Sequence, residues 1–300
     1  MKNKSYLAIS SKQTVSSLRA DYIIALVPSV IWSIWRFGIN AMIITAVACA
    51  SGLITDSIIN TLKRKKFSAP TVYALYASLV FALILYSETH YLISLIGAVL
   101  TIVLIHMLGG EGNTVFFAPI ISRLFLINAF PLQYSVPNDL PASFFKIGLL
   151  PNATTFDFIL GTASGCIGAV SAMAVTTGGI YLLLKKHTNK LSPLSYILTV
   201  FLLFFFFPVI EGRGMESALY EILSSEILFV CFFILTNFSA FTLSAVSRIT
   251  EGVLCALFTF VFLRFGEVEN ACFWAVVLSS VFTVFANKLY FKIRYRKNEK

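Results

Sequence analysis

Two charged residues lie where the surrounding sequence is apolar enough to cross a membrane. Glu226 is the tenth residue of the apolar stretch 217–237, and Arg123 lies inside the shorter stretch 115–130. A single charge at the centre of a bilayer costs ~3 kcal/mol on insertion scales, and such residues are usually functional or paired. We therefore predict that Glu226 and Arg123 form a buried charge pair. For Glu226, the alternative is a protonated, neutral side chain that faces other parts of the protein.

The other ionisable side chains give weaker indications of chemistry. Asp56 lies near the end of the apolar stretch 39–59, where we expect it to neutralise the basic run 63–66 or to cap a helix locally rather than bind an ion. Glu251 lies near the start of the stretch 249–265, where a carboxylate suits the positive end of a helix. The histidines lie at the ends of apolar stretches or in a loop, without clustered carboxylates. The five cysteines form no Cys-x-x-Cys pair, so we expect buried structural thiols and no metal site.

The composition indicates the environment in which these residues act. Of the 300 residues, 58% are hydrophobic and 12% are charged, whereas soluble domains carry roughly 25% charged residues. This predicts a multi-pass protein of the cell membrane. The net charge of +9 comes from basic residues in loops and tails rather than on one folded face, so nucleic acid is not an expected partner. The first 20 residues are polar and basic, so no cleavable signal peptide is expected.

The apolar stretches predict ten membrane-spanning helices, divided equally between two halves. Residues 1–20 are expected to form a cytoplasmic basic leader, 21–150 a first five-helix unit, and 151–300 a second five-helix unit with a basic cytoplasmic tail. The expected spans are 22–37, 39–59, 71–87, 91–108, 115–130, 156–183, 193–209, 217–237, 249–265 and 270–291.

The distribution of basic residues predicts the orientation of these spans. With both termini in the cytoplasm, the loops and tails on that side carry 18 of the 23 Lys and Arg residues. The opposite side carries four, and Arg123 lies within a span. Cytoplasmic loops of membrane proteins show this excess. The loop 131–155 is therefore predicted to lie outside. Removing one helix from the count would place a basic loop on the wrong side.

Two further patterns bear on the arrangement of the helices. An odd number of helices in each half would make the halves inverted repeats, and the sequence GEGN at 110–113 is echoed by GEVEN at 266–270. The sixth stretch, 156–183, is rich in Gly, Ala and Ser, which let another backbone approach closely. It is expected to be either a tightly packed structural helix or a helix beside a cofactor or a permeation path.

Three motifs resemble those of one family, which comprises the D subunit of the Rnf electron-transport complex and the related B subunit of the sodium-pumping NADH:quinone reductase. The family's Gly-Gly-x-Gly-Asn loop has its counterpart in Gly109, Gly110 and Asn113, followed by Phe116-Phe117-Ala118-Pro119. The core of its central helix has its counterpart in Ser164-Gly165 and in the later run Gly178-Gly179-Ile180-Tyr181-Leu182-Leu183. Its C-terminal motifs match residues 232–237, 248–252 and 264–266.

The resemblance implies an all-α polytopic fold of about ten helices in two inverted five-helix repeats, similar to urea transporters. It implies a non-autonomous membrane subunit that couples electron transfer to ion translocation with other membrane and peripheral subunits. Members commonly carry FMN, which a flavin transferase attaches to a Thr just before the central helix. The matching position is Thr154, and the other residues that the resemblance assigns to cofactor binding are Gly109, Gly110, Asn113, Ser164 and Gly165.

Several positions depart from the family pattern around the flavin motif. Pro151-Asn152 stands where the family has Ser-Gly, and Gly148, Ala169 and Asn237 stand where it has acidic residues. A phosphate at Thr154 could use the exposed N–H groups at the start of the sixth helix, but Asp157 already places a negative charge there. The alternative is that Thr154 or its neighbour is an N-cap.

A second function remains open from the sequence. The chain could be a solute or ion permeation protein on the urea-transporter-like fold, without a redox cofactor. Bound flavin in the purified protein would discriminate between this and the electron-transport subunit.

Overall fold

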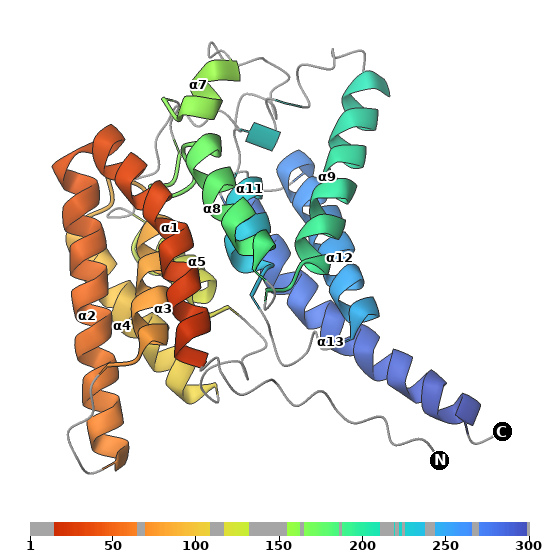
Figure 1. Cartoon of the computed structure of the whole chain (residues 1–300), viewed down its shortest axis with the longest axis horizontal. Coiled ribbons are helices and arrows are strands. Elements are labelled where there is room, and N and C mark those ends of the chain that lie inside the picture. The colour runs from red at the N-terminus through yellow and green to blue at the C-terminus, as the bar shows by residue number, and fades with distance from the viewer. Residues whose placement is uncertain are drawn as a thin grey trace.

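The described part of the chain is mainly helical (Figure 1). The structure, a computed structural model, describes residues 15–64, 70–108, 117–131, 155–162, 165–185, 188–210, 219, 222–223, 226–237, 244–265 and 270–298. Within these ranges the only extended pairing is an isolated antiparallel bridge between Tyr86 and Cys166. The expected all-α class is therefore confirmed for the part of the chain that can be described.

Twelve helical elements follow one another along the described ranges. Three helical stretches there are long and apolar enough to cross a membrane, namely Arg19–Phe37, Ile39–Lys63 and Ala245–Phe265. The elements are α1 (Val15–Phe37), α2 (Ile39–Arg64), α3 (Val72–Leu83), α4 (Tyr91–Met107), α5 (Ala118–Ala129), α7 (Thr155–Leu160), α8 (Ala172–Leu184), α9 (Leu191–Ile210), α11 (Ile227–Phe229), the π-helix η1 (Val230–Ile234), α12 (Ala245–Phe265) and α13 (Ala271–Asn298).

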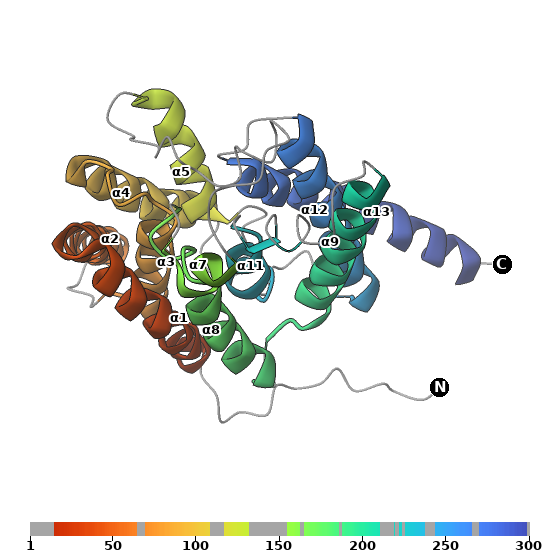
Figure 2. The same cartoon turned by 90° about the horizontal axis from the view of Figure 1, so that it is seen from above.

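The helices form two groups with a central set between them. Seen from above, α1 to α5 lie on one side and α9, α12 and α13 on the other, with α7, α8 and α11 in the middle (Figure 2). Within the groups, α2 packs on α4, and α12 packs on both α9 and α13. The first group meets the central set mainly where α1 packs on α8. The start of α1 and the end of α13 lie at the same end of the bundle (Figure 1).

The turn between α1 and α2 agrees with the very short connection expected from the sequence. Only Gly38 separates the two helices, and its φ of 65° lies in the left-handed region, which glycine adopts without steric cost. Its N–H still donates to the Ile34 carbonyl oxygen at 2.8 Å. The chain therefore reverses direction with little loss of backbone hydrogen bonding.

The expected continuous helix over 156–183 is wrong. The structure breaks it into α7 and α8, with Gly161 at a φ of 79°. Ser171 begins α8 as an N-cap whose side chain accepts a hydrogen bond from the Ala174 N–H. The intervening backbone bonds across the fold instead, because the N–H groups of Ile167 and Gly168 donate to the carbonyl oxygens of Leu85 and Leu83 at 2.8 and 2.7 Å.

Two other expected helices differ for related reasons. The stretch 71–87 ends as a helix at Leu83, and the carbonyl groups of Leu83 and Leu85 accept from the broken sixth helix instead. The expected helix 217–237 placed Glu226 in mid-helix, which is also wrong. Glu226 is the N-cap of the three-residue helix α11, which continues as the π-helix η1.

Two adjacent glycines of α8 allow its close approach to neighbouring elements. A Cβ atom at Gly178 would collide with the carbonyl oxygen of Ala25 on α1, and one at Gly179 would collide with the ring of Phe232 on η1. These positions match the close approach expected for small residues in membrane helices. They support the packing interpretation of this part of the Gly-rich stretch.

The variant Gly178→Ala is expected to destabilise the protein, although Ala is the better helix former by about 1 kcal/mol. The added methyl group would meet backbone, which cannot rotate aside, and overpacking typically costs ~1–3 kcal/mol. Thermal unfolding of the purified full-length protein in detergent measures this as a lower midpoint temperature. Ile180→Ala, at a side chain that is 54% exposed, is the matched control. Equal midpoints for Gly178→Ala and the wild type would contradict the packing.

Candidate functional site

The centre of the fold is the place where two irregular segments meet. The segment that follows α3 pairs with the segment between α7 and α8 through the Tyr86–Cys166 bridge. The residues Leu83, Leu85, Tyr86, Cys166 and Ile167 are at most 1% exposed. Non-helical backbone at membrane depth is tolerated only where it is buried in protein or lines a cavity. Here each segment supplies hydrogen-bond partners for the other.

Arg123 enters this centre from α5 and is completely buried. Its Nη1 donates to Cys166 Sγ at 3.0 Å, and its Nε donates to Asn270 Oδ1 at 3.4 Å. The guanidinium carbon lies 4.3 Å from the ring centroid of Phe273 and 5.1 Å from that of Tyr86. Cations over aromatic faces gain about 2 kcal/mol or more when desolvated, so the two rings offset part of the cost of burying this charge.

Glu226 reaches the same network from the other side. Cys166 Sγ donates to Glu226 Oε1 at 3.2 Å, and Glu226 is 8% exposed. The thiol of Cys166 therefore links the two charged residues that the sequence singled out. The stabilising charge pair itself stays a prediction, because the structure gives their placement and not their coupling energy. Nothing in the sequence placed Cys166 between them, since this cysteine belongs to no motif of spaced ligands.

A carboxylate, a thiol and a guanidinium are joined here in one line of hydrogen bonds, in which the guanidinium keeps its protons and acts only as a donor. The thiol is both acceptor and donor in the chain from Arg123 to Glu226, as its chemistry allows. Ionisable groups buried inside membrane proteins commonly mark ion or proton pathways. The network is thus a candidate functional site at the junction of the two irregular segments.

Most residues that the family resemblance assigned to a cofactor lie outside the described part of the chain. These are Thr154, Gly109, Gly110, Asn113 and Ser164. Gly165 is described and half-buried, and a Cβ atom there would be in ordinary contact with Val170.

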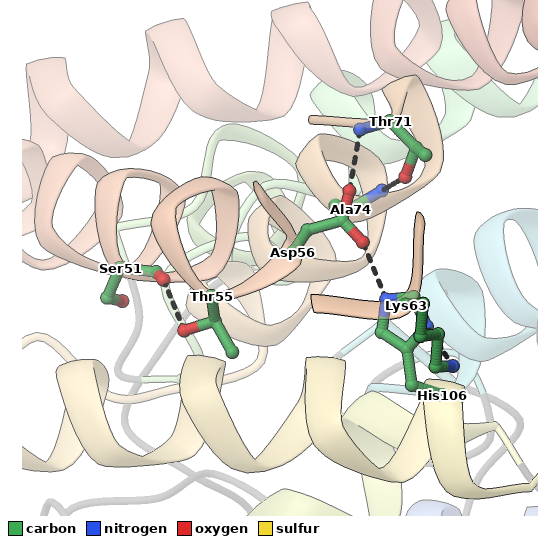
Figure 3. A network of polar contacts seen from close by, with 7 residues as sticks. All are labelled: Ser51, Thr55, Asp56, Lys63, Thr71, Ala74 and His106. Carbon is green, nitrogen blue, oxygen red and sulfur yellow. Dashed lines mark hydrogen bonds and ion pairs between the residues drawn. The ribbon is translucent and has the colours of Figure 1, made fainter. Parts of the chain in front are cut away.

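A second polar network lies at the end of the bundle where α1 begins (Figure 3). Asp56 on α2 accepts a hydrogen bond from the N–H of Thr71, the N-cap of α3, at 2.7 Å. Its other oxygen lies 2.7 Å from His106 Nε2 on α4. The local capping role expected for Asp56 agrees with the first contact. His106 therefore has a carboxylate partner that the sequence alone did not indicate.

Glu251 makes a contact that differs from the one expected. α12 begins four residues earlier than the sequence suggested, at Ala245, so Glu251 is not at the helix start. Its Oε2 accepts a hydrogen bond from Ser192 Oγ on α9 at 2.8 Å, and Asn189 Nδ2 donates to the same hydroxyl at 2.6 Å. Glu251 thus ties α12 to the start of α9 rather than capping its own helix.

The variants Glu226→Gln and Arg123→Gln are each expected to lower stability, because each leaves the other group buried without its counter-charge. Breaking one side of a buried pair typically costs ~3–5 kcal/mol. The double variant should lose less than the sum of the single losses, as measured by thermal unfolding of the purified protein. Strictly additive losses would show that the two charges are not coupled.

Cys166 offers a further check on the same network. Cys166→Ser keeps a group that can both donate and accept and should retain most of the coupling between Arg123 and Glu226. Cys166→Ala removes the link and should reduce the coupling measured in the same unfolding cycle.

Comparison with known proteins identifies the family. The model of the NQR2, RnfD, RnfE family matches residues 3–295. The chain is 25% identical to the D subunit of the Na(+)-translocating ferredoxin:NAD(+) oxidoreductase complex of Acetobacterium woodii, over 92% of this chain and 89% of that protein. It is 21% identical to the proton-translocating counterpart of Clostridium ljungdahlii, over 90% and 88%. It is 27% identical to the D subunit of the ion-translocating oxidoreductase complex of Methanosarcina acetivorans, over 92% and 91%. The chain therefore belongs to the NQR2, RnfD, RnfE family.

Proposed function

We propose that this chain is the D-type membrane component of an Rnf-like complex that couples electron transfer to ion translocation. The observation that carries the proposal is the family match over nearly the whole chain, together with relatives that align over most of their length and are named as the D subunit. Other membrane and peripheral subunits of such a complex are its expected partners. Two relatives are named for different ions, sodium and protons, so the proposal covers ion translocation in general.

The proposed arrangement is ten spans in two inverted five-helix repeats, 21–150 and 151–300, as in urea transporters. The packing supports it, because α2 packs on α4 as α9 packs on α12. The first and sixth spans meet where α1 packs on α8. In addition, the third and eighth spans contain short helices, α3 with 12 residues and α11 with three followed by five of η1.

The proposed orientation places both termini in the cytoplasm. The end of the bundle where α1 starts also carries the basic residues Lys63 and Lys185, at the ends of α2 and α8, and Lys190, just before α9. The positive-inside rule requires such residues on the cytoplasmic side. The Lys185 ammonium donates to Asp21 at 2.8 Å, and this hydrogen bond raises the pKa of Lys185. It therefore stays charged on that side.

Cysteine labelling tests this orientation. Phe156→Cys at the start of α7 should react with a membrane-impermeant maleimide added outside the cell, and Leu184→Cys at the end of α8 should react only after the membrane is opened. The two native side chains are similarly exposed, at 73% and 77%, so they form a matched pair. Wild-type protein controls for its own cysteines. Labelling of Phe156→Cys only from the cytoplasmic side would refute the topology.

The proposed cofactor is FMN, held by a phosphoester at Thr154 that a flavin transferase forms. Described neighbours fit a phosphate group, because Arg36 at the end of α1 donates to the Thr162 carbonyl at 2.7 Å and so brings a cation beside α7. Phe156 presents an exposed aromatic ring on the same short helix. The negative charge of Asp157 opposes a phosphate, although its Oδ1 is engaged by the Thr162 hydroxyl at 2.8 Å. When bound, FMN would supply one- and two-electron transfer.

In-gel flavin fluorescence tests this assignment. Full-length protein made with a flavin transferase should give a fluorescent band that Thr154→Ala loses and the neighbouring control Thr155→Ala keeps. A band that survives in Thr154→Ala would place the attachment elsewhere. If the wild type gives no band and releases no flavin when denatured, the redox role falls and ion or solute permeation without a cofactor becomes the better proposal.

A further inference from the structure

Four groups form a continuous chain of contacts at the cytoplasmic end proposed above, where α2, α3 and α4 meet (Figure 3). Lys63 Nζ lies 3.2 Å from His106 Nδ1, and His106 Nε2 lies 2.7 Å from Asp56 Oδ1. The second carboxylate oxygen, Asp56 Oδ2, accepts from the Thr71 N–H at 2.7 Å. The family match and the proposed redox role assign nothing to these residues.

The hydrogen-bond donors and acceptors in this series of contacts determine which nitrogen of the neutral His106 ring carries the hydrogen. A lysine ammonium can only donate hydrogen bonds, so His106 Nδ1 must accept from Lys63. The hydrogen of the neutral ring is then on Nε2, which donates to Asp56. In this state the single basic position left on the ring, Nδ1, is covered by Lys63.

The three side chains in this series of contacts differ in how far they are buried, from Asp56 inside to Lys63 at the surface. The Asp56 side chain is 3% exposed and that of His106 is 17% exposed, while Lys63 is exposed at the end of α2. A proton from water can therefore reach His106 Nδ1 when Lys63 moves away, whereas the carboxylate is shielded on both oxygens. The groups that face the imidazole are Asp56 and Lys63 from α2, with the Thr71 N–H of α3 beyond the carboxylate.

We propose that Asp56, His106 and Lys63 form a proton-binding site in which one proton displaces Lys63 from the imidazole. His106 Nδ1 takes the proton from water, and the Lys63 N–H···Nδ1 hydrogen bond breaks because both groups are then donors. Lys63 keeps its charge and turns to solvent. The imidazolium stays paired with the Asp56 carboxylate, and the site gains one positive charge in total.

Two unpartnered polar groups on the same faces support a role beyond local packing. Asn60 and Gly52 flank Asp56 at four-residue spacing on α2, so all three share one face. Among the residues that the structure describes, the Nδ2 of Asn60, which is 8% exposed, has no hydrogen-bond partner, and the same holds for Ser78 Oγ, which is completely buried against Gly52. Polar groups therefore lie on both sides of the carboxylate, at Asn60 toward the end of α2 and at Ser78 further inward, where a proton-loaded site could find further partners.

The site is also connected to the central network through α3. Asp56 binds the N-cap of this helix, at its positive end, and α3 ends at Leu83, where the pairing with the broken sixth helix begins. Twelve residues at ~1.5 Å each make a rod of about 18 Å. Asp56 thus connects His106 to the helix whose last carbonyl, that of Leu83, accepts from Gly168 near Cys166.

Nitrogen-15 NMR of histidine-labelled full-length protein in lipid bilayers tests the proposal, since the chain has only three histidines. His106→Gln assigns the signal. At high pH, His106 should be the Nε2–H tautomer, and it should become an imidazolium in one step as the pH falls. Lys63→Met should move the midpoint of that step to higher pH, and Asp56→Asn should move it to lower pH, because opposite charges favour and like charges disfavour the imidazolium.

The signal of His90 is the internal control and should keep its midpoint in both variants. Lys63 is exposed, so Lys63→Met is expected to fold even if Asp56→Asn does not. An Nδ1–H tautomer at high pH would overturn the proposal. So would a midpoint that stays in place in Lys63→Met, or one that moves to lower pH. None of these outcomes depends on flavin or on electron transfer, so the proposed function can fail without affecting this test.

Discussion

The fold depends on how two interrupted helices satisfy their backbone hydrogen bonds inside a membrane. The lipid interior offers no partner for an exposed N–H or C=O group, so an interruption is stable only when other protein groups replace the lost helical bonds. The segment after α3 and the segment between α7 and α8 do this for one another, through Ile167 and Gly168 donating to Leu85 and Leu83. This pairing holds the first half of the chain to the second at its centre.

The same junction explains how charged residues can be buried there. Cys166 lies at the bridge itself, so its thiol is fixed between Arg123 and Glu226. The Tyr86 ring that faces the Arg123 guanidinium comes from the other segment of the bridge. Backbone pairing and charge burial are therefore one arrangement, and disturbing either would disturb the other.

The sequence could predict the class of protein and much of its helical order, but not this junction. Apolar stretches, the glycine at position 38 and the motifs of the family indicated the membrane class, the first turn and the family. Hydropathy indicates that residues 156–183 lie in a membrane. It does not indicate whether their backbone N–H groups form hydrogen bonds within one helix or with another segment. Gly161, Gly165 and Gly168 are the main local sign of the break. The contact between Asp56 and His106 joins residues 50 positions apart, for which no local pattern exists.

The acids Asp56 and Glu251, near the proposed cytoplasmic end, show that the symmetry of the two halves does not explain every contact. Asp56 ties α2 to α4 through His106, and Glu251 ties α12 to α9 through Ser192. Each contact joins the equivalent pair of helices in its half. In an inverted repeat, however, equivalent residues would lie at opposite faces of the membrane, whereas both of these acids lie toward the end where α1, α3, α9 and α12 begin. The two contacts are therefore better explained by a requirement of that face, where acids meet the basic ends of the helices, than by descent from one ancestral half.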